Sequence, residues 1–129
     1  MFNTCNKIKY NILIVDDDID LCKALSLELG QSYNVTAVNN AKCAFRELCN
    51  KTFDLIIIDI QLPGMDGVEL LETINKKYPH IKTIIFTAFP DSHTFRSILK
   101  GNADDYLLKF GGPQPLIDAI NKLFQPSNN

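Results

Sequence analysis

The feature that most constrains the fold of this chain is a regular alternation between two kinds of apolar pattern. Five short runs, rich in isoleucine and valine, are typical of β-strands. These runs cover residues 11–15, 34–38, 55–58, 82–86 and 105–108. The run 55–58 is apolar at every position, as expected of a strand that is buried on both faces of a parallel sheet.

Longer stretches with helical spacing separate these runs. Leu21, Leu25 and Leu29 recur at every fourth position, and the glycine that follows them, Gly30, predicts the end of a helix. The other four apolar faces are Ala41, Ala44, Phe45 and Leu48; Leu71, Ile74 and Tyr78, after Gly67; Phe95, Ile98 and Leu99, before Gly101; and Leu116, Ile117, Ile120, Leu123 and Phe124. Five strands that alternate with five helices predict an α/β fold, with a parallel sheet between two layers of helices.

The length and composition favour one compact domain. Apolar residues make up 46% of the 129 residues, which is enough to bury a core. We predict one domain over residues 8–125, followed at 126–129 by a polar tail or the start of a linker. The net charge of -2 gives no basis for direct nucleic-acid binding by this domain.

No part of the chain has the pattern of a signal peptide or of a membrane span. The cysteines show neither a metal-binding nor a redox spacing, so we interpret them as core residues or scattered free thiols. They are Cys5, Cys22, Cys43 and Cys49. A reduced, cytoplasmic protein without a membrane partner is therefore expected.

Polar side chains stand where four of the predicted strands end. Asp16 and Asp17 follow the first strand and Asp59 follows the third, while Thr87 and Lys109 follow the fourth and fifth. In open parallel sheets, ligands bind beyond the carboxyl ends of the strands. If these four strands are neighbours, the five polar groups meet at one edge.

The chemistry of such a group points to phosphate. Clustered carboxylates raise each other's pKa unless a cation joins them, and Mg²⁺ suits a site with few carboxylates and several waters. A carboxylate can also act as a nucleophile and form an aspartyl-phosphate. Lys109 and Thr87 would then each bind one phosphoryl oxygen. Pro63, Gly64 and Gly67 would shape a tight loop after the third strand.

Each residue also has a simpler interpretation. The run Asp16 to Asp18 is favourable at the start of any helix, Thr87 suits any strand, and Lys109 suits any surface. Asp59 is harder to explain in this way, because a carboxylate directly after four core residues needs a partner. The joint placement at the ends of four strands favours the functional interpretation.

Four segments occur in an order and spacing that resemble a known family. They are "ILIVDDD", "DLIIIDIQLPGMDG", "IIFTA" and "GNADDYLLK". Over residues 11–124 the sequence resembles the receiver domain of two-component response regulators. This resemblance implies a flavodoxin-like, doubly wound sheet of five parallel strands in the order 2-1-3-4-5, with five helices.

The resemblance also implies roles for the acidic residues. Asp59 would be the phosphoacceptor, which takes a phosphoryl group from a sensor histidine kinase, a phosphotransfer protein or a small phosphodonor. Asp17 and Asp59 would bind Mg²⁺ directly, Asp16 would act largely through water, and the backbone carbonyl of Gln61 would complete the protein's share.

The remaining implied roles concern signalling. Thr87 and Lys109 would bind phosphoryl oxygens, and Tyr106 matches the switch aromatic whose ring turns inward as Thr87 moves. The fourth helix, fifth strand and fifth helix would form the output surface for a partner protein or an attached domain. The chain would be a regulator that assists its own phosphorylation and dephosphorylation, not an enzyme, and either a monomer or a phosphorylation-dependent homodimer.

One departure from the family pattern lies after the fifth strand. The family has a proline after the lysine, joined by a cis bond, whereas Phe110 follows Lys109 here. A cis bond before another residue costs about 2.5–4 kcal/mol, so the chain either bears this cost or takes a different path through Gly111 and Gly112. Phe110 is then a candidate partner contact, and Phe89 a candidate barrier to water at the acyl phosphate.

Three alternatives remain from the residues. A phosphatase of the haloacid-dehalogenase type would use Asp16 as nucleophile with Asp18 two positions on, but the later acidic motif and room for a cap domain are missing. A receiver-like module that binds partners without phosphorylation is a second alternative. A flavin-binding module is the third, but its Ser/Thr-rich phosphate loops are missing.

Overall fold

The sheet of this protein contains five parallel strands. The structure is a computed structural model that describes residues 9–60, 67–88 and 103–124. The strands are β1 (Asn11–Val15), β2 (Asn34–Val38), β3 (Leu55–Ile58), β4 (Lys82–Thr87) and β5 (Asp105–Leu108). Their order is β2-β1-β3-β4-β5, which confirms the predicted topology. The bounds agree with the apolar runs, except that β4 extends one residue further, to Thr87.

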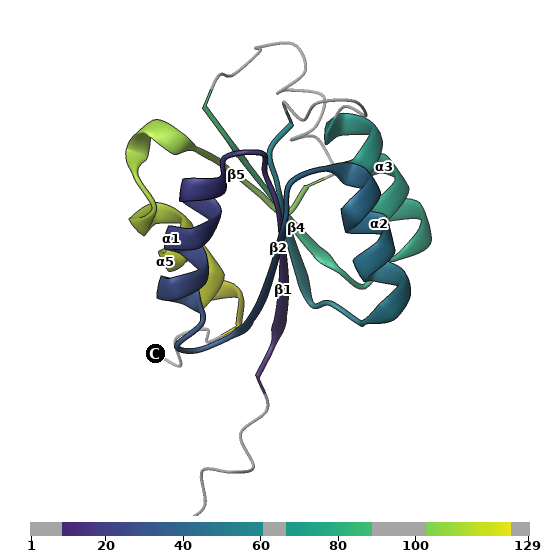
Figure 1. Cartoon of the computed structure of the whole chain (residues 1–129), viewed down its shortest axis with the longest axis horizontal. Helices are drawn as coiled ribbons and strands as arrows, with labels where there is room; N and C mark the ends of the chain where they lie inside the picture. Colours follow the sequence, from purple (N-terminus) through teal and green to yellow (C-terminus); the bar gives the residue numbers. More distant parts are fainter. Residues whose placement is uncertain (1–8, 61–66, 89–102, 125–129) are drawn as a thin grey trace, which may run out of the picture.

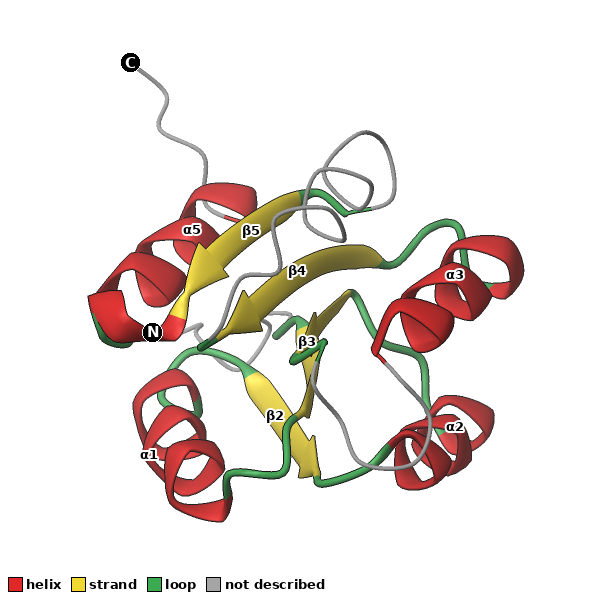
Figure 2. Ribbon diagram, turned by 90° about the horizontal axis from the view of Figure 1, so that it is seen from above, coloured by secondary structure: helices red, strands yellow, loops and turns green. Residues whose placement is uncertain are grey.

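Helices cover both faces of the sheet. The described helices are α1 (Ile19–Leu29), α2 (Ala41–Asn50), α3 (Gly67–Lys77) and α5 (Gln114–Phe124), with a short 3₁₀ turn, η2 (Lys109–Gly111). α1 and α5 lie on one side of the sheet and α2 and α3 on the other (Figures 1 and 2). The predicted helix around Phe95 lies outside the described residues. No helix in the described ranges has the length and apolar character needed to span a bilayer.

Two of the helices begin at capping residues that the sequence supplies. The Asp18 side chain accepts a hydrogen bond from the Leu21 amide at the start of α1, and Asn40 does the same for the Cys43 amide in α2. Such caps satisfy backbone donors that have no partner within the helix. Gly30 follows α1 as predicted.

The strands separate two apolar cores. Along β1, Ile12 and Ile14 pack toward α1 and α5, while Leu13 and Val15 pack toward α2 and α3. Successive side chains of a strand point to opposite faces, so a strand between two layers needs apolar residues at every position. This requirement explains the uninterrupted apolar runs in the sequence.

The strand register aligns the carboxyl ends of the central strands. Val15 pairs with Ile58, and Ile58 pairs with Ile85 on the next strand. At the far side, Thr87 pairs with Leu108. The residues that follow β1, β3 and β5 therefore emerge, with the end of β4, at one edge of the sheet.

Candidate functional site

Three carboxylates converge at the carboxyl edge of the sheet. Each strand's pairing continues one residue past its end, because the Asp16 amide donates to the Val38 carbonyl and the Asp59 amide to the Val15 carbonyl, both at 3.0 Å. Carboxylate oxygens of Asp16, Asp17 and Asp59 lie within 4.8 Å of one another. Asp16 and Asp59 are buried, whereas Asp17 is exposed, so the cluster opens to solvent on the Asp17 side.

This donor set fits a hard divalent cation. Three carboxylates supply oxygen ligands only, and the exposed side of the cluster leaves room for water. Mg²⁺ binds through few carboxylates and keeps several waters. The residues present therefore suit Mg²⁺, as the sequence predicted.

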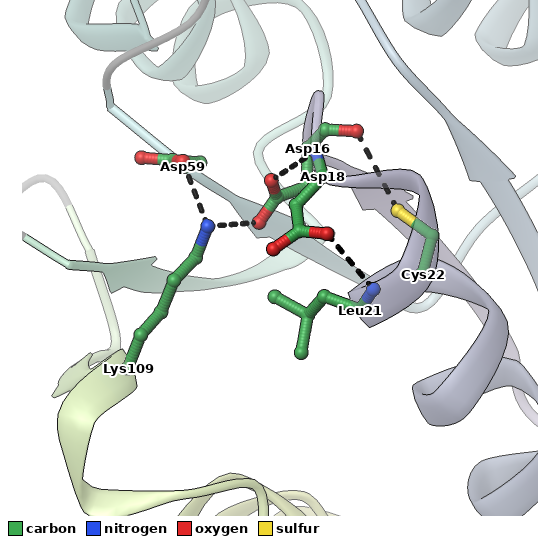
Figure 3. A network of polar contacts seen from close by, with 6 residues as sticks. All are labelled: Asp16, Asp18, Leu21, Cys22, Asp59 and Lys109. Atoms are coloured by element: carbon green, nitrogen blue, oxygen red, sulfur yellow. Dashed lines mark hydrogen bonds and ion pairs between the residues drawn. The ribbon is translucent and has the colours of Figure 1, made fainter.

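Lys109 bridges two of the carboxylates. Its Nζ lies 2.7 Å from Asp16 Oδ2 and 3.0 Å from Asp59 Oδ2, and Figure 3 shows the ammonium group between the two acids. Two buried carboxylates at this separation repel each other unless a positive charge compensates them. Lys109 supplies that charge in the structure.

The environment raises the pKa values of Asp16 and Lys109. Burial raises the pKa of Asp16, against the opposing effect of its hydrogen bonds from Lys109 and the Asp18 amide. Burial by itself lowers the pKa of Lys109, but the hydrogen bonds to Asp16 and Asp59 outweigh it, so the pKa of Lys109 lies above its ordinary value. The ammonium group therefore stays charged at neutral pH.

Lys109 reaches the pocket without a cis bond. The described residues contain no cis peptide bond, and the chain after β5 forms the 3₁₀ turn η2 instead. This turn ends at Gly112, whose φ is 81° and whose amide donates to the Lys109 carbonyl at 2.9 Å. The chain therefore takes a different path through Gly111 and Gly112, the second of the two predicted possibilities. Phe110 projects into solvent with 79% of its surface exposed.

Asp18, the N-cap of α1, and Cys22 within α1 both donate hydrogen bonds to Asp16. The Asp18 amide donates to Asp16 Oδ1 at 2.9 Å, and the Cys22 thiol donates to the Asp16 carbonyl at 3.5 Å (Figure 3). Burial raises the pKa of Cys22 to about 11, so its thiol remains a protonated donor. The Asp18 carboxylate caps α1 and is not among the clustered acids, in line with its simpler interpretation. The sequence showed no signal for the contact made by Cys22.

Thr87 and Tyr106 lie on the neighbouring strands β4 and β5. Thr87 is fully buried, and its Oγ1 has no hydrogen-bond partner among the described residues. A buried hydroxyl without a partner costs about 1–3 kcal/mol, so an incoming oxygen would be stabilising there. Tyr106 is half-buried on β5, and burial raises its pKa to about 12. Their roles as a switch stay predictions.

The loop after β3 requires one of its predicted glycines. A Cβ atom on Gly67 would lie 2.4 Å from Ile60 Cα and 2.7 Å from the Asp59 carbonyl oxygen. The start of α3 therefore packs directly on the backbone that carries the acidic cluster. The other residues predicted for this region and for the site, which are Gln61, Pro63, Gly64 and Phe89, lie outside the described residues.

Comparisons with known proteins agree with this geometry. A family model described as the response regulator receiver domain matches residues 12–121. The transcriptional regulatory protein ZraR of Klebsiella oxytoca is 41% identical over 100 residues, which are 77% of this chain and 23% of ZraR. The response regulator protein FleR of Pseudomonas aeruginosa is 36% identical over 111 residues, 84% of this chain and 23% of FleR. The chain thus spans less than a quarter of the length of these relatives.

Solved structures show the same fold. A CheY-like response regulator receiver domain protein from Methanospirillum hungatei JF-1 superposes with a TM-score of 0.84 and 32% identity, over 90% of this chain and 94% of that one. The response regulator TrrA from Thermotoga maritima, solved in complex with Mg²⁺ and BeF, superposes with a TM-score of 0.78 and 32% identity. The match covers 90% of this chain and 99% of TrrA.

Proposed function

The chain belongs to the response regulator receiver domain family, and on that basis we propose that it is a phosphorylation-dependent switch with Asp59 as its phosphoacceptor. One observation carries the assignment: Asp59 lies within the acidic cluster and within 3.0 Å of the Lys109 ammonium. Members of this family are regulatory signalling proteins, and the proposed activity is regulation of a partner.

The proposed transfer uses one oxygen of the Asp59 carboxylate as nucleophile. This oxygen forms a bond to phosphorus while the bond from phosphorus to the donor breaks, which is an N–P bond in a phosphohistidine and an O–P bond in a small acyl phosphate. The electron pair of the broken bond stays with the donor. Mg²⁺, held by Asp16, Asp17, Asp59 and the Gln61 carbonyl, would neutralise charge on the phosphoryl oxygens.

Lys109 and Thr87 would act on the other phosphoryl oxygens. The Lys109 ammonium already lies against Asp59, so it needs only to exchange a carboxylate oxygen for a phosphoryl oxygen. The Thr87 hydroxyl, which lacks a partner among the described residues, would donate to another. In this proposal Lys109 and Thr87 position the phosphoryl group and stabilise the negative charge on its oxygens.

The signal would leave the pocket through β4 and β5. A shift of Thr87 toward the phosphoryl group would open space at the end of β4, into which the Tyr106 ring turns. Such a local change in charge can bias a two-state element. The output surface would comprise β5, α5 and the predicted fourth helix. It would control a partner protein or an attached domain, and a histidine kinase or phosphotransfer protein would supply the phosphoryl group.

Phosphorylation in solution tests the assignment of Asp59. The protein is incubated with acetyl phosphate and Mg²⁺, and intact-mass measurement with peptide mapping locates the added phosphoryl group. We expect one group on Asp59, and none in Asp59→Asn or after chelation of Mg²⁺. Label on Asp16 would instead support the phosphatase alternative, and a chain that takes no label would support a binding module that works without phosphorylation.

A further inference from the structure

We propose that Cys22 is a positioning residue of the acidic cluster: its thiol holds the peptide group that joins Asp16 to Asp17 and so directs the Asp17 carboxylate toward the metal site. This inference rests on the metal-binding part of the proposed function. Asp17 is the exposed member of the three acids, and yet its carboxylate lies within 4.8 Å of those of Asp16 and Asp59. Something other than burial must therefore hold it in place.

The Asp17 side chain has few restraints of its own. Among the described residues, it makes no hydrogen bond or ion pair. Asp16 and Asp59 differ, because both of their carboxylates contact the Lys109 ammonium. An exposed carboxylate without a partner can adopt several rotamers, so its position depends on where its backbone starts. The place of Asp17 in the cluster is therefore set by the peptide groups on either side of it.

The peptide group between Asp16 and Asp17 is fixed through its carbonyl. The Asp16 amide donates to the Val38 carbonyl at 3.0 Å, which ties the amino side of Asp16 to β2. The Asp16 carbonyl accepts from the Cys22 thiol at 3.5 Å, and this oxygen has no other donor within the described ranges. Because a peptide group is planar, a partner that holds the Asp16 oxygen also holds the Asp17 amide. Cys22 thus sets the direction in which the chain enters Asp17.

The surroundings of Cys22 suit this role. Cys22 is only 8% exposed and lies near the start of α1, beside the residue that follows β1 (Figure 3). Burial raises the pKa of its thiol to about 11, so the thiol remains a donor at neutral pH. The Asp18 amide, at the N-cap of α1, donates to the Asp16 carboxylate at 2.9 Å. The start of α1 therefore contacts both the side chain and the carbonyl of Asp16, and a helix is a more rigid support than a loop.

Mg²⁺ binding by the unphosphorylated protein tests the role of the thiol. Isothermal titration calorimetry gives the Kd for Mg²⁺ in the wild type and in Cys22→Ala, which has no donor. Loss of a partner that orients a metal ligand usually weakens metal binding about 10–100-fold, and a thiol is a weak donor, so we expect the Kd to rise roughly three- to tenfold. Cys22→Ser keeps a donor and should recover most of this loss. Cys43→Ala, at the half-buried cysteine of α2, should match the wild type.

A second measurement follows the peptide group itself in the metal-free protein. The Asp17 amide belongs to the same peptide group as the Asp16 carbonyl, so its NMR resonance responds to the hydrogen-bond partner of that oxygen. We expect this resonance to move in Cys22→Ala, to move less in Cys22→Ser and to stay in place in Cys43→Ala. Ile74→Val, in the core on the other face of the sheet, should lower stability but leave the resonance and the Kd unchanged. This control separates positioning from general destabilisation.

Three outcomes would overturn this inference. They are a wild-type Kd in Cys22→Ala, an equal rise of the Kd in Cys43→Ala or Ile74→Val, and a raised Kd in Cys22→Ala with an unmoved Asp17 resonance. If circular dichroism shows that Cys22→Ala does not fold, Cys22→Val fills the same space without a donor and must give the results expected of Cys22→Ala.

Phosphorylation of Asp59 by acetyl phosphate, measured on the same samples, separates this inference from the proposed function. If the wild type binds Mg²⁺ and is phosphorylated while Cys22→Ala binds Mg²⁺ equally well, only the role of Cys22 is wrong. If the wild type binds Mg²⁺ more tightly than Cys22→Ala but Asp59 takes no phosphoryl group, the role of Cys22 stands and the phosphoacceptor assignment is wrong. A wild type that binds no Mg²⁺ would overturn both.

Discussion

At the scale of single residues, the charge balance of the acidic pocket depends on Lys109. Its ammonium group contacts Asp16 and Asp59, which are both buried, and its own side chain is only 17% exposed. When one partner of a buried ion pair is removed, the remaining charge has no counter-charge. The resulting loss of stability is larger than the net stability that the intact pair contributes. Lys109 and a bound cation are therefore alternative sources of the same positive charge.

Lys109→Gln should destabilise the metal-free protein and make it more responsive to Mg²⁺. We expect the free energy of unfolding in EDTA to fall by about 3 kcal/mol, because two buried carboxylates lose their counter-charge. Urea denaturation measures this change. Added Mg²⁺ should restore more stability to the variant than to the wild type.

Lys82→Gln, at an exposed lysine that begins β4, is the matched control and should change stability little. Equal stability of Lys109→Gln and wild type in EDTA would contradict the charge argument. So would an equal gain from Mg²⁺ in both proteins.

The convergence of the site could be predicted from the sequence, but its internal contacts could not. Parallel strands bring their carboxyl ends to one edge, so Asp16, Asp59 and Lys109 could be placed together from their positions alone. That Lys109 spans both acids depends on the turn after β5 and on the reach of its side chain. The contact from the Cys22 thiol to the Asp16 carbonyl depends on the orientation of α1. Neither contact has a recognisable pattern in the sequence.

At the scale of elements, the apolar runs predicted the strands, and helical spacing predicted which side of α1 faces the core. A strand between two helical layers must be apolar throughout, so its bounds are visible in the sequence. In α1, Leu25 and Leu29 are buried while Leu27 is exposed. Leu27 falls outside the series of Leu21, Leu25 and Leu29 that recurs at every fourth position, so the spacing distinguishes these leucines.

The turn that follows β5 has one position that requires glycine. Gly112 has φ 81° and ψ 179°, a region that is essentially restricted to glycine. Gly112→Ala should therefore lower the free energy of unfolding by about 1–3 kcal/mol and disturb the turn that carries Lys109. Thermal or urea denaturation measures the loss.

Gly111→Ala is the matched control, because a Cβ there would meet only Pro115 Cγ at 3.8 Å. This neighbouring substitution should change stability by less than about 0.5 kcal/mol. Comparable losses in the two variants would show that the conformation of Gly112 is not the cause.

At the scale of the whole molecule, the two edges of the sheet carry different groups of side chains. The acidic pocket lies at the carboxyl edge, while an aromatic cluster lies at the opposite end, where Tyr10 and Phe124 stack with ring centroids 4.2 Å apart. Tyr33 packs against Phe124 and donates to Asn121 Oδ1 at 2.6 Å. This cluster joins the residue before β1, the turn after α1 and the end of α5, so these three segments pack together at the amino edge of the sheet.

Stability of the whole molecule should fall in alkali. Burial raises the pKa of Cys22 from 9.0 to about 11 and that of Tyr106 from 10.0 to about 12, so the fold favours their neutral forms. Their contributions are fully present below the unfolded-state values and are lost as the pH rises through the folded-state values. We expect the free energy of unfolding to decline from about pH 9 to pH 12.

Tyr106→Phe tests one part of this decline. The variant should lose less stability than the wild type between pH 10 and 12, because its ring has no proton to release. Urea denaturation at a series of pH values measures both proteins. Parallel curves for the two proteins would contradict the assignment.

The stacking of Tyr10 on Phe124 also bears on how this chain can be rearranged by design. Because these residues are in contact, a short covalent linker can join them without crossing the sheet. The exposed turn at Pro79 and His80 then offers a place to open the backbone, at the amino end of β4. Such a circular permutant would keep the acidic pocket intact and move the attachment points for a fluorescent or enzymatic fusion along the amino edge of the sheet, from β1 to β4.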